Sequence, residues 1–344
     1  MRTLLLYLLL VFFASCQSRP TNEADTTSPE EDTLTPPFGN IERMDAALES
    51  LIPSTSSIEV LSEGYDWIEG PVWVASENML LFSDIPKNSI FQWKEGADAS
   101  LYLKPSGYTG DNRREGEPGS NGLLIDSENR LVLCQHGDRR IARMSSPVNN
   151  PQPQFETIVD NYQGKKLNSP NDATYSKSGD LYFTDPPYGL EGNMDDPTKE
   201  IPFQGVYRVK AGTSVAELLI DSISRPNGIA LSPDQSKLYV ACSDPKKAVW
   251  YVYDLEANQP VNGHYFYDVT NLVGSEKGLP DGMKVHSSGA LFATGPGGVW
   301  IFNADGKVLG KIKTGQATAN CAFDAREQYL YITADMYLLR VKLT

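Results

Sequence analysis

Short apolar runs with period-two alternation recur along the chain, and each pair of runs is separated by a turn sequence. In the copies that begin at Asn121 (NGLLIDSENRLVLCQH) and at Asn171 (NDATYSKSGDLYFTDP), two alternating runs flank SENR and KSGD. Alternation of this kind predicts strands with one buried face, and the Gly, Asn, Asp and Ser between them predict tight turns. Each copy therefore predicts one β-hairpin.

This hairpin pattern occurs six times, with further strands such as GVYRV from 205 and VWYVYD from 249 between copies. The copies follow one another at intervals of 39 to 56 residues, close to the about 40 to 50 residues of a four-stranded propeller blade. A β-helix has a much shorter period, and a sandwich does not repeat its own turn six times. We predict an all-β six-bladed β-propeller over residues 57–344, in which the strand 57–61 (SIEVL) completes the last blade and closes the ring. The alternative is an all-β protein whose copies resemble one another by coincidence.

The sequence before the repeats divides into three segments. Residues 1–16 place Arg2 before the apolar run 4–13, and the small residues Ala14 and Ser15 precede Cys16. This pattern is typical of a signal peptide, since the run is too short to span a bilayer, and Phe-Ala-Ser-Cys resembles a bacterial lipobox. We expect an exported protein of the bacterial cell envelope with lipid on Cys16, whose only membrane contact is that anchor. Secretion without lipidation is the alternative.

Two short segments follow the cysteine. Residues 17–40 are rich in Thr, Pro and acidic residues and poor in large apolar ones, which predicts a flexible tether. In residues 41–56, Ile41, Met44, Leu48 and Leu51 recur at helical spacing. This spacing predicts a short helical lead-in to the propeller.

Charge and cysteine content limit the classes of function. The net charge of −14 argues against nucleic-acid binding, which needs a basic surface. Besides Cys16, the chain has Cys134, Cys242 and Cys321. An odd number in a chain of this length indicates no disulfide framework.

The first residue of each copy is an acid or an amide: Glu69, Asn121, Asn171, Asn227, Asp281 and Asn320. The innermost strands of a propeller line its axis, so these six positions are expected to form a ring around the channel mouth. Carboxylate and amide oxygens suit hard cations, and Ca²⁺ accepts amide oxygens more readily than Mg²⁺ does. We predict one divalent cation, with Ca²⁺ first and Mg²⁺, Mn²⁺ or Zn²⁺ as alternatives. Asn-Gly and Asp-Gly are also turn dipeptides, so a purely structural role is the competing interpretation.

At these positions the chain resembles the senescence-marker protein, gluconolactonase and luciferin-regenerating enzyme family, especially its bacterial gluconolactonase branch. The motifs that carry the resemblance are EGPVW at 69, NSPND at 168, FTDPPYGL at 183, RPNGIALSPD at 225 and LPDGMKV at 279. The resemblance implies a propeller whose axial divalent ion is held by Glu69, Asn171, Asn227 and Asp281. It also implies a catalytic role for Asp281, and it leaves Asn121 and Asn320 either as substrate contacts or as residues that contact the ligands of the ion.

Three other residues are candidates from their position next to predicted strands. His136 follows the outgoing strand of the second copy, where it is expected to act as a catalytic base or acid or to have only a structural role. Asp185 and Tyr188 lie in TDPPYG at the same place in the third copy, and the two prolines restrict that loop. We expect both to contact substrate.

Together these features favour a metal-dependent hydrolase that opens a sugar lactone of the glucono-1,5-lactone kind to its aldonic acid. In this hypothesis the cation polarises the carbonyl, and Asp281 acts as base or nucleophile. Hydrolysis of another lactone or of an organophosphate ester is the second hypothesis. A non-catalytic propeller that binds a partner on its face, with a structural ion, is the third.

Overall fold

A computed structural model describes residues 38–344 of the chain. The predicted signal peptide, the predicted lipidation site Cys16 and all but the last residues of the predicted tether lie outside this range. Within residues 38–344, no helix is long and apolar enough to cross a membrane.

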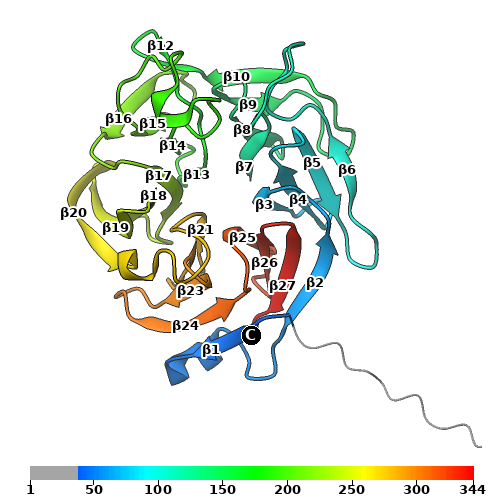
Figure 1. The fold of residues 1–344 in the computed structure, drawn as a ribbon, viewed down its shortest axis with the longest axis vertical. Helices are drawn as coiled ribbons and strands as arrows, with labels where there is room; N and C mark the ends of the chain where they lie inside the picture. Colours follow the sequence, from blue (N-terminus) through cyan, green and yellow to red (C-terminus); the bar gives the residue numbers. More distant parts are fainter. Residues whose placement is uncertain (1–37) are drawn as a thin grey trace, which may run out of the picture. The chain divides into compact units, whose positions relative to one another are not determined.

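Six antiparallel sheets are arranged around a central axis, which confirms the predicted six-bladed β-propeller (Figure 1). Each blade is built on four antiparallel strands, and the first strand of each lies nearest the axis (Figure 1). The first three blades contain β3 (Ile68–Val74), β4 (Met79–Asp84), β5 (Ser89–Trp93) and β6 (Ser100–Leu103); β7 (Ser120–Ile125), β8 (Leu131–Gln135), β9 (Arg140–Met144) and β10 (Phe155–Val159); and β13 (Ala173–Tyr175), β14 (Leu181–Asp185), β15 (Gly205–Val209) and β16 (Ala216–Ile220).

The other three blades include the longest strands. They are β17 (Pro226–Leu231), β18 (Lys237–Asp244), β19 (Lys247–Glu256) and β20 (Gln259–Asp268); β21 (Met283–Val285), β22 (Leu291–Gly295), β23 (Gly298–Phe302) and β24 (Val308–Lys313); and β25 (Thr318–Phe323), β26 (Tyr329–Ala334), β27 (Tyr337–Lys342) and β2 (Ile58–Glu63). A two-stranded hairpin, β11 (Asn161–Tyr162) with β12 (Lys165–Lys166), joins the second blade to the third.

The ring is closed by a strand from the start of the domain. β2 pairs antiparallel with β27, the last strand of the chain, with Ile58 opposite Val341. The predicted clasp at 57–61 is therefore confirmed. Pairing the two ends of the domain joins the first and last blades and covers the edge of β27, so that β2 becomes the outer strand of the sixth blade.

The predicted helical lead-in is only partly helical. Residues Asn40–Arg43 form strand β1, which adds a fifth strand to the fifth blade by pairing with β24. Only the 3₁₀ helix η1 (Ala46–Ser50) follows, and the Asp45 carboxylate caps it by accepting from the Ala47 N–H at 2.8 Å. The prediction of one helix from Ile41 was wrong because an unpaired edge of β24 offers that segment backbone hydrogen bonds, which local apolar spacing cannot reveal.

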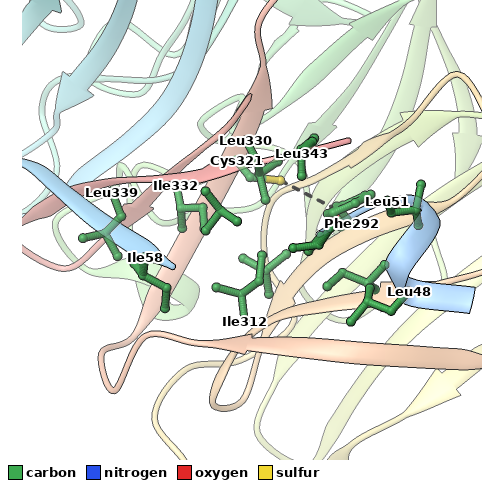
Figure 2. Close-up of a cluster of buried hydrophobic side chains, with 14 of the residues drawn as sticks. Leu48, Leu51, Ile58, Phe292, Ile312, Cys321, Leu330, Ile332, Leu339 and Leu343 are labelled. Carbon is green, nitrogen blue, oxygen red and sulfur yellow. Dashed lines mark hydrogen bonds between the residues drawn. The ribbon is translucent and has the colours of Figure 1, made fainter. Parts of the chain in front are cut away.

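The hydrophobic core lies between neighbouring blades. Figure 2 shows the cluster between the fifth and sixth blades, where Phe292 and Ile312 meet Ile332 and Leu339. Leu48 from η1 joins this cluster and is fully buried. Truncation of a buried Leu of this kind to Ala costs about 2–5 kcal/mol. The lead-in is therefore part of the folded unit.

Candidate active site

A cavity of about 450 Å³ opens at one end of the propeller axis. All six blades contribute to it through residues at or just before their first strands, from Glu69 in the first blade to Thr318 in the sixth. The polar residues of its wall are Glu69, Glu117, Asn121, Asn171, Tyr188, Arg225, Asn227, Ser243, Glu276, Asp281 and Thr318.

The four residues predicted to hold a metal all line this cavity: Glu69, Asn171, Asn227 and Asp281. Glu69, Asn171 and Asn227 are buried, with 2%, 2% and 5% of their surface exposed. Asp281 is partly exposed to the cavity. Glu69 and Asp281, more than 200 positions apart in the sequence, therefore lie at one site. This agrees with the ring around the axis that the six copies predict.

Several buried oxygen atoms in this ring have no hydrogen-bond partner among residues 38–344. They include Oδ1 of Asn121, of Asn227 and of Asp281. The amide of Asn227 is oriented by its Nδ2 group, which donates to Ser243 Oγ at 2.9 Å and leaves Oδ1 free to accept. A buried acceptor left without a partner costs about 1–3 kcal/mol, so these three oxygens are available to accept from water or a ligand or to coordinate an ion.

The chemistry of this donor set fits a hard cation. Carboxylate and amide oxygens are typical ligands of Ca²⁺ and of Mg²⁺, whereas Zn²⁺ sites use mainly His and Cys. Over residues 38–344, no group of three or more His, Cys, Asp or Glu side chains is placed to hold a metal ion. The ring contains only two such residues, Glu69 and Asp281, and amides supply its other oxygens.

The ring carries an excess of negative charge in a buried place. Burial raises the pKa of Glu69, and the nearby Asp172 charge raises it further. The pKa of Asp281 is raised well above its ordinary value, by burial first and then by the charges of Glu69 and Asp172. A divalent cation between the carboxylates would favour their charged forms and reverse both shifts.

Glycines after the ring residues allow the blades to approach the axis closely. A Cβ atom on Gly122 would lie 2.8 Å from the Asn171 carbonyl oxygen, and one on Gly228 would lie 2.2 Å from that of Asp281. On Gly282 it would lie 2.0 Å from the Asn320 side chain. These three glycines are needed because the next blade comes too close for a side chain, and not because a turn requires them. Close packing between blades therefore explains the Asn-Gly and Asp-Gly dipeptides better than a turn does.

Hydroxyl groups on the second strands fix the spacing between blades. The hydroxyl of Ser83 in β4 donates to the Asn121 carbonyl at 3.0 Å, and that of Thr184 in β14 donates to the Asn227 carbonyl at 2.7 Å. Each bond therefore ties one blade to the ring residue of the next.

The predicted substrate contacts divide into two groups. Asn121 and Tyr188 line the cavity, and the Tyr188 hydroxyl has no partner among residues 38–344. Asn320 is not part of the cavity wall: its Nδ2 group donates to Glu69 Oε2 at 3.2 Å and its Oδ1 accepts from the Cys321 N–H. The structure therefore assigns Asn320 to the support of Glu69, because Gly282 lets it pack directly beside the ring.

Asp185 also differs from its predicted place at the cavity. It is fully buried, and its Oδ2 accepts from the Asn168 N–H at 2.8 Å. The Asn168 side chain in turn donates to the Asp185 carbonyl, so Asp185 holds the loop that presents Asn171. Burial raises the pKa of Asp185 to about 7, against the lowering effect of the Asn168 hydrogen bond. Its carboxylate supports the site from behind and does not contact the cavity.

His136 is fully buried and is not part of the cavity wall. Its Nδ1 lies 3.4 Å from Oε2 of Glu117, which does line the cavity. Sequence reasoning missed Glu117 because it belongs to a loop, RREGEPG, that has no counterpart in the other copies. It also missed Arg225 and Ser243, which line the cavity. Arg225 lies two residues before Asn227, and Ser243 directly follows the copy that begins at Asn227.

The cavity wall also contains apolar residues, among them Trp67, Pro245, Val273 and Leu279. A lining of apolar residues with a few polar groups is typical of small-molecule sites, because the apolar residues exclude water while the polar groups orient the ligand.

This fold is shared with one family of known proteins. Residues 67–335 match the family described as SMP-30/Gluconolactonase/LRE-like region, and the chain belongs to it. The resemblance found from the sequence motifs is thereby confirmed.

Individual relatives define the similarity more closely. A gluconolactonase of Zymomonas mobilis is 40% identical over 315 residues, which cover 89% of this chain and 86% of the relative. A lactonohydrolase, oryL, of Aspergillus oryzae is 26% identical over 50% of this chain and 43% of its own length. The solved structure of a gluconolactonase from Xanthomonas campestris superposes with a TM-score of 0.76 at 29% identity, over 90% of this chain and 98% of that one.

Proposed function

We propose that this protein hydrolyses a sugar lactone of the glucono-1,5-lactone kind to its aldonic acid in the axial cavity, with the help of one divalent cation. The observation that carries the proposal is the group of unpartnered oxygens of Asn121, Asn227 and Asp281, which lie in one cavity beside Glu69. The identity of 40% with a gluconolactonase over most of both chains supports the same reaction class.

In this proposal Glu69, Asn171, Asn227 and Asp281 hold the ion. When bound, a divalent cation supplies Lewis-acid polarisation of the lactone carbonyl and favours the oxyanion that develops on it. Asn121 and Tyr188 are placed to bind substrate hydroxyls, because both line the cavity with unpartnered polar atoms. Asp281 is also the proposed base or nucleophile of the reaction.

Among the possible ions, the donor set favours Ca²⁺. Calcium accepts six to eight oxygens in flexible geometry and includes amide oxygens readily, whereas Mg²⁺ needs a near-octahedral set. Mn²⁺ shares the preference for oxygen, and Zn²⁺ fits least well because no His or Cys stands in the ring. Restoration of activity by a series of these ions after chelation ranks them directly.

The test of the proposed reaction is acid release from glucono-1,5-lactone, measured at constant pH and corrected for spontaneous hydrolysis. We expect turnover by the wild type and its loss after chelation. In Asp281→Asn we expect turnover to fall at least about 100-fold while the cooperative thermal transition is kept. An Asp281→Asn protein with wild-type turnover would contradict the assignment of the site.

The apolar residues of the cavity wall favour one second candidate substrate class. Trp67, Val273 and Leu279 offer contact area that a sugar ring does not fully use. A lactone with an apolar substituent, or an organophosphate ester, would contact these residues. Comparison of kcat/KM over a panel of lactones and phosphotriesters tests this, and a phosphotriester preferred over every lactone would reverse the order of the candidates. If the wild type turns over no member of the panel, the non-catalytic binding propeller becomes the better account.

We also propose that the protein is exported and anchored to the bacterial envelope by lipid on Cys16. The support is the sequence of residues 1–16, with its short apolar run before Phe-Ala-Ser-Cys. Expression of the full chain with labelled palmitate should label the wild type and not Cys16→Ser. Equal labelling of the two would contradict the anchor.

A further inference from the structure

Four carboxylates line the cavity, and three of them have partners or a proposed ion. Glu69 and Asp281 belong to the ring, and Oε2 of Glu276 lies 2.8 Å from the Nζ of Lys311. Lys311 is itself almost fully buried, so this pair is held in place. The fourth carboxylate is Glu117, which has no Lys or Arg within ion-pair distance among residues 38–344.

The loop that carries Glu117 is fixed on both sides of the residue. Arg114 donates to the carbonyl oxygens of Gly137 and Gly189, at 2.5 and 2.8 Å, and so ties the loop to the second and third blades. After Glu117, the Gly119 N–H donates to the Ile85 carbonyl at 3.0 Å, just before β7 begins. Glu117 is therefore presented to the cavity by anchored backbone.

His136 stands directly behind this carboxylate. It is fully buried, its Nδ1 lies 3.4 Å from Glu117 Oε2, and neither ring nitrogen has a hydrogen-bond partner among residues 38–344. Gly189 packs against it so closely that an added Cβ would lie 2.4 Å from the His136 Cβ. A buried imidazole with an unpartnered nitrogen 3.4 Å from one carboxylate is placed to donate to that carboxylate and so to orient it.

We propose that Glu117 is the proton acceptor for the attacking water and that His136 is its positioning residue. This inference rests on the proposed lactone hydrolysis and replaces the role of base given above to Asp281, which then serves to hold the ion. It assigns Glu117 this role because the proposal gives Glu69 and Asp281 to the ion, and Glu276 pairs with Lys311. Glu117 faces the same cavity, and among residues 38–344 its one basic partner within ion-pair distance is His136. A carboxylate that binds a cation is a weaker base than one that does not.

The step balances with groups that the cavity and the substrate supply. The water oxygen forms a bond to the lactone carbonyl carbon, its proton passes to the Glu117 carboxylate, and the carbonyl π electrons move onto oxygen. When the tetrahedral adduct collapses, the bond between the carbonyl carbon and the ring oxygen breaks. The ring oxygen takes the proton back from Glu117, which regenerates the carboxylate and gives the aldonic acid.

Glu117→Gln is the decisive variant, because Gln keeps the shape and removes the base. We expect kcat to fall by about 100-fold to 10,000-fold, the usual contribution of a general base, while KM changes by less than about threefold. The affinity for Ca²⁺, measured by calorimetry, is expected to stay near the wild-type value. Glu115→Gln is the matched control, since Glu115 lies on the same loop with its side chain 81% exposed.

His136 is tested by comparison of two substitutions. His136→Asn retains a donor close to the position of Nδ1, whereas His136→Ala retains none. We expect kcat to fall in His136→Ala and to be largely restored in His136→Asn, with Ca²⁺ affinity and the thermal transition similar in both. A purely structural histidine would give two variants with equal kcat and unequal stability.

A rescue experiment keeps the test valid if Glu117→Gln is poorly folded. In Glu117→Ala, added formate can occupy the space of the lost carboxylate and should restore part of kcat in proportion to its concentration. A kcat of Glu117→Gln within about threefold of wild type, or a loss of Ca²⁺ affinity equal to the loss of kcat, would overturn the inference. Failure of the proposed function would look different, because the wild type itself would then hydrolyse no lactone.

Discussion

Replacement of the buried Asp185 by Asn should make the protein more stable at neutral and alkaline pH. The pKa of this carboxyl is about 7 in the folded protein and 3.8 as its ordinary value, because burial disfavours the charged form. Between these two pH values the folded state keeps a proton that the unfolded state has released, so the wild type loses stability as the pH rises through this window. Asn has no such proton and no such loss.

The expected size follows from the two pKa values. A shift from 3.8 to about 7, at about 1.4 kcal/mol per pH unit, gives a difference of about 4 kcal/mol in the free energy of unfolding above pH 7. Below about pH 4 the difference should vanish, since both states of the wild type are then protonated. The Asn side chain can still accept from the Asn168 N–H through Oδ1, so the loop before Asn171 should remain in place.

The assay is urea unfolding of wild type and Asp185→Asn from pH 4 to pH 8.5, with both proteins treated with chelator. Other groups titrate equally in both proteins and cancel in the difference. Asp195→Asn serves as the control, because Asp195 is an exposed carboxyl of the same loop region. A difference that is constant with pH, or one that favours the wild type as the pH rises, would refute the reasoning.

Three further changes test how the blades are assembled around the axis. Gly282→Ala should weaken Ca²⁺ binding and lower stability by about 1–3 kcal/mol, because its Cβ would displace the Asn320 side chain that supports Glu69; calorimetry and urea unfolding measure the two effects. Thr184→Val should cost about 1–3 kcal/mol, since the buried Asn227 carbonyl loses its donor at 2.7 Å, and an unchanged unfolding midpoint would contradict this. A chain that begins at residue 64 lacks β2 and should aggregate in light scattering, because the edge of β27 is then unpaired.

The features that follow from the repeat could be predicted, because each copy carries the whole signal in a short stretch. Turn residues between alternating strands indicate a blade, and the same position in six blades must face the axis. The repeat therefore predicts a shared site for Glu69, Asn171, Asn227 and Asp281, and all four line one cavity. It also predicts the clasp strand, since a propeller must join its ends.

The features that depend on contacts between distant segments could not be predicted in the same way. Ile41 lies in a strand because β24 has a free edge, and nothing near Ile41 in the sequence shows that edge. Glu117 reaches the cavity from a loop outside the repeat. Asp185 and Asn320 have side chains that could contact substrate. Their hydrogen bonds to Asn168 and to Glu69 instead make them hold other residues of the site in place. Residue type indicates what a side chain can do, and packing decides which group it meets.

The most direct test of the account is a titration of the chelator-treated protein with Ca²⁺, with glucono-1,5-lactone hydrolysis measured after each addition. At a protein concentration well above the dissociation constant, we expect activity to be absent at the start, to rise in proportion to added Ca²⁺, and to stop rising at one ion per chain. Asp281→Asn should show no such rise. Full activity in protein shown by elemental analysis to hold no divalent metal would contradict the claim that the axial ring of Glu69, Asn171, Asn227 and Asp281 works through a bound cation.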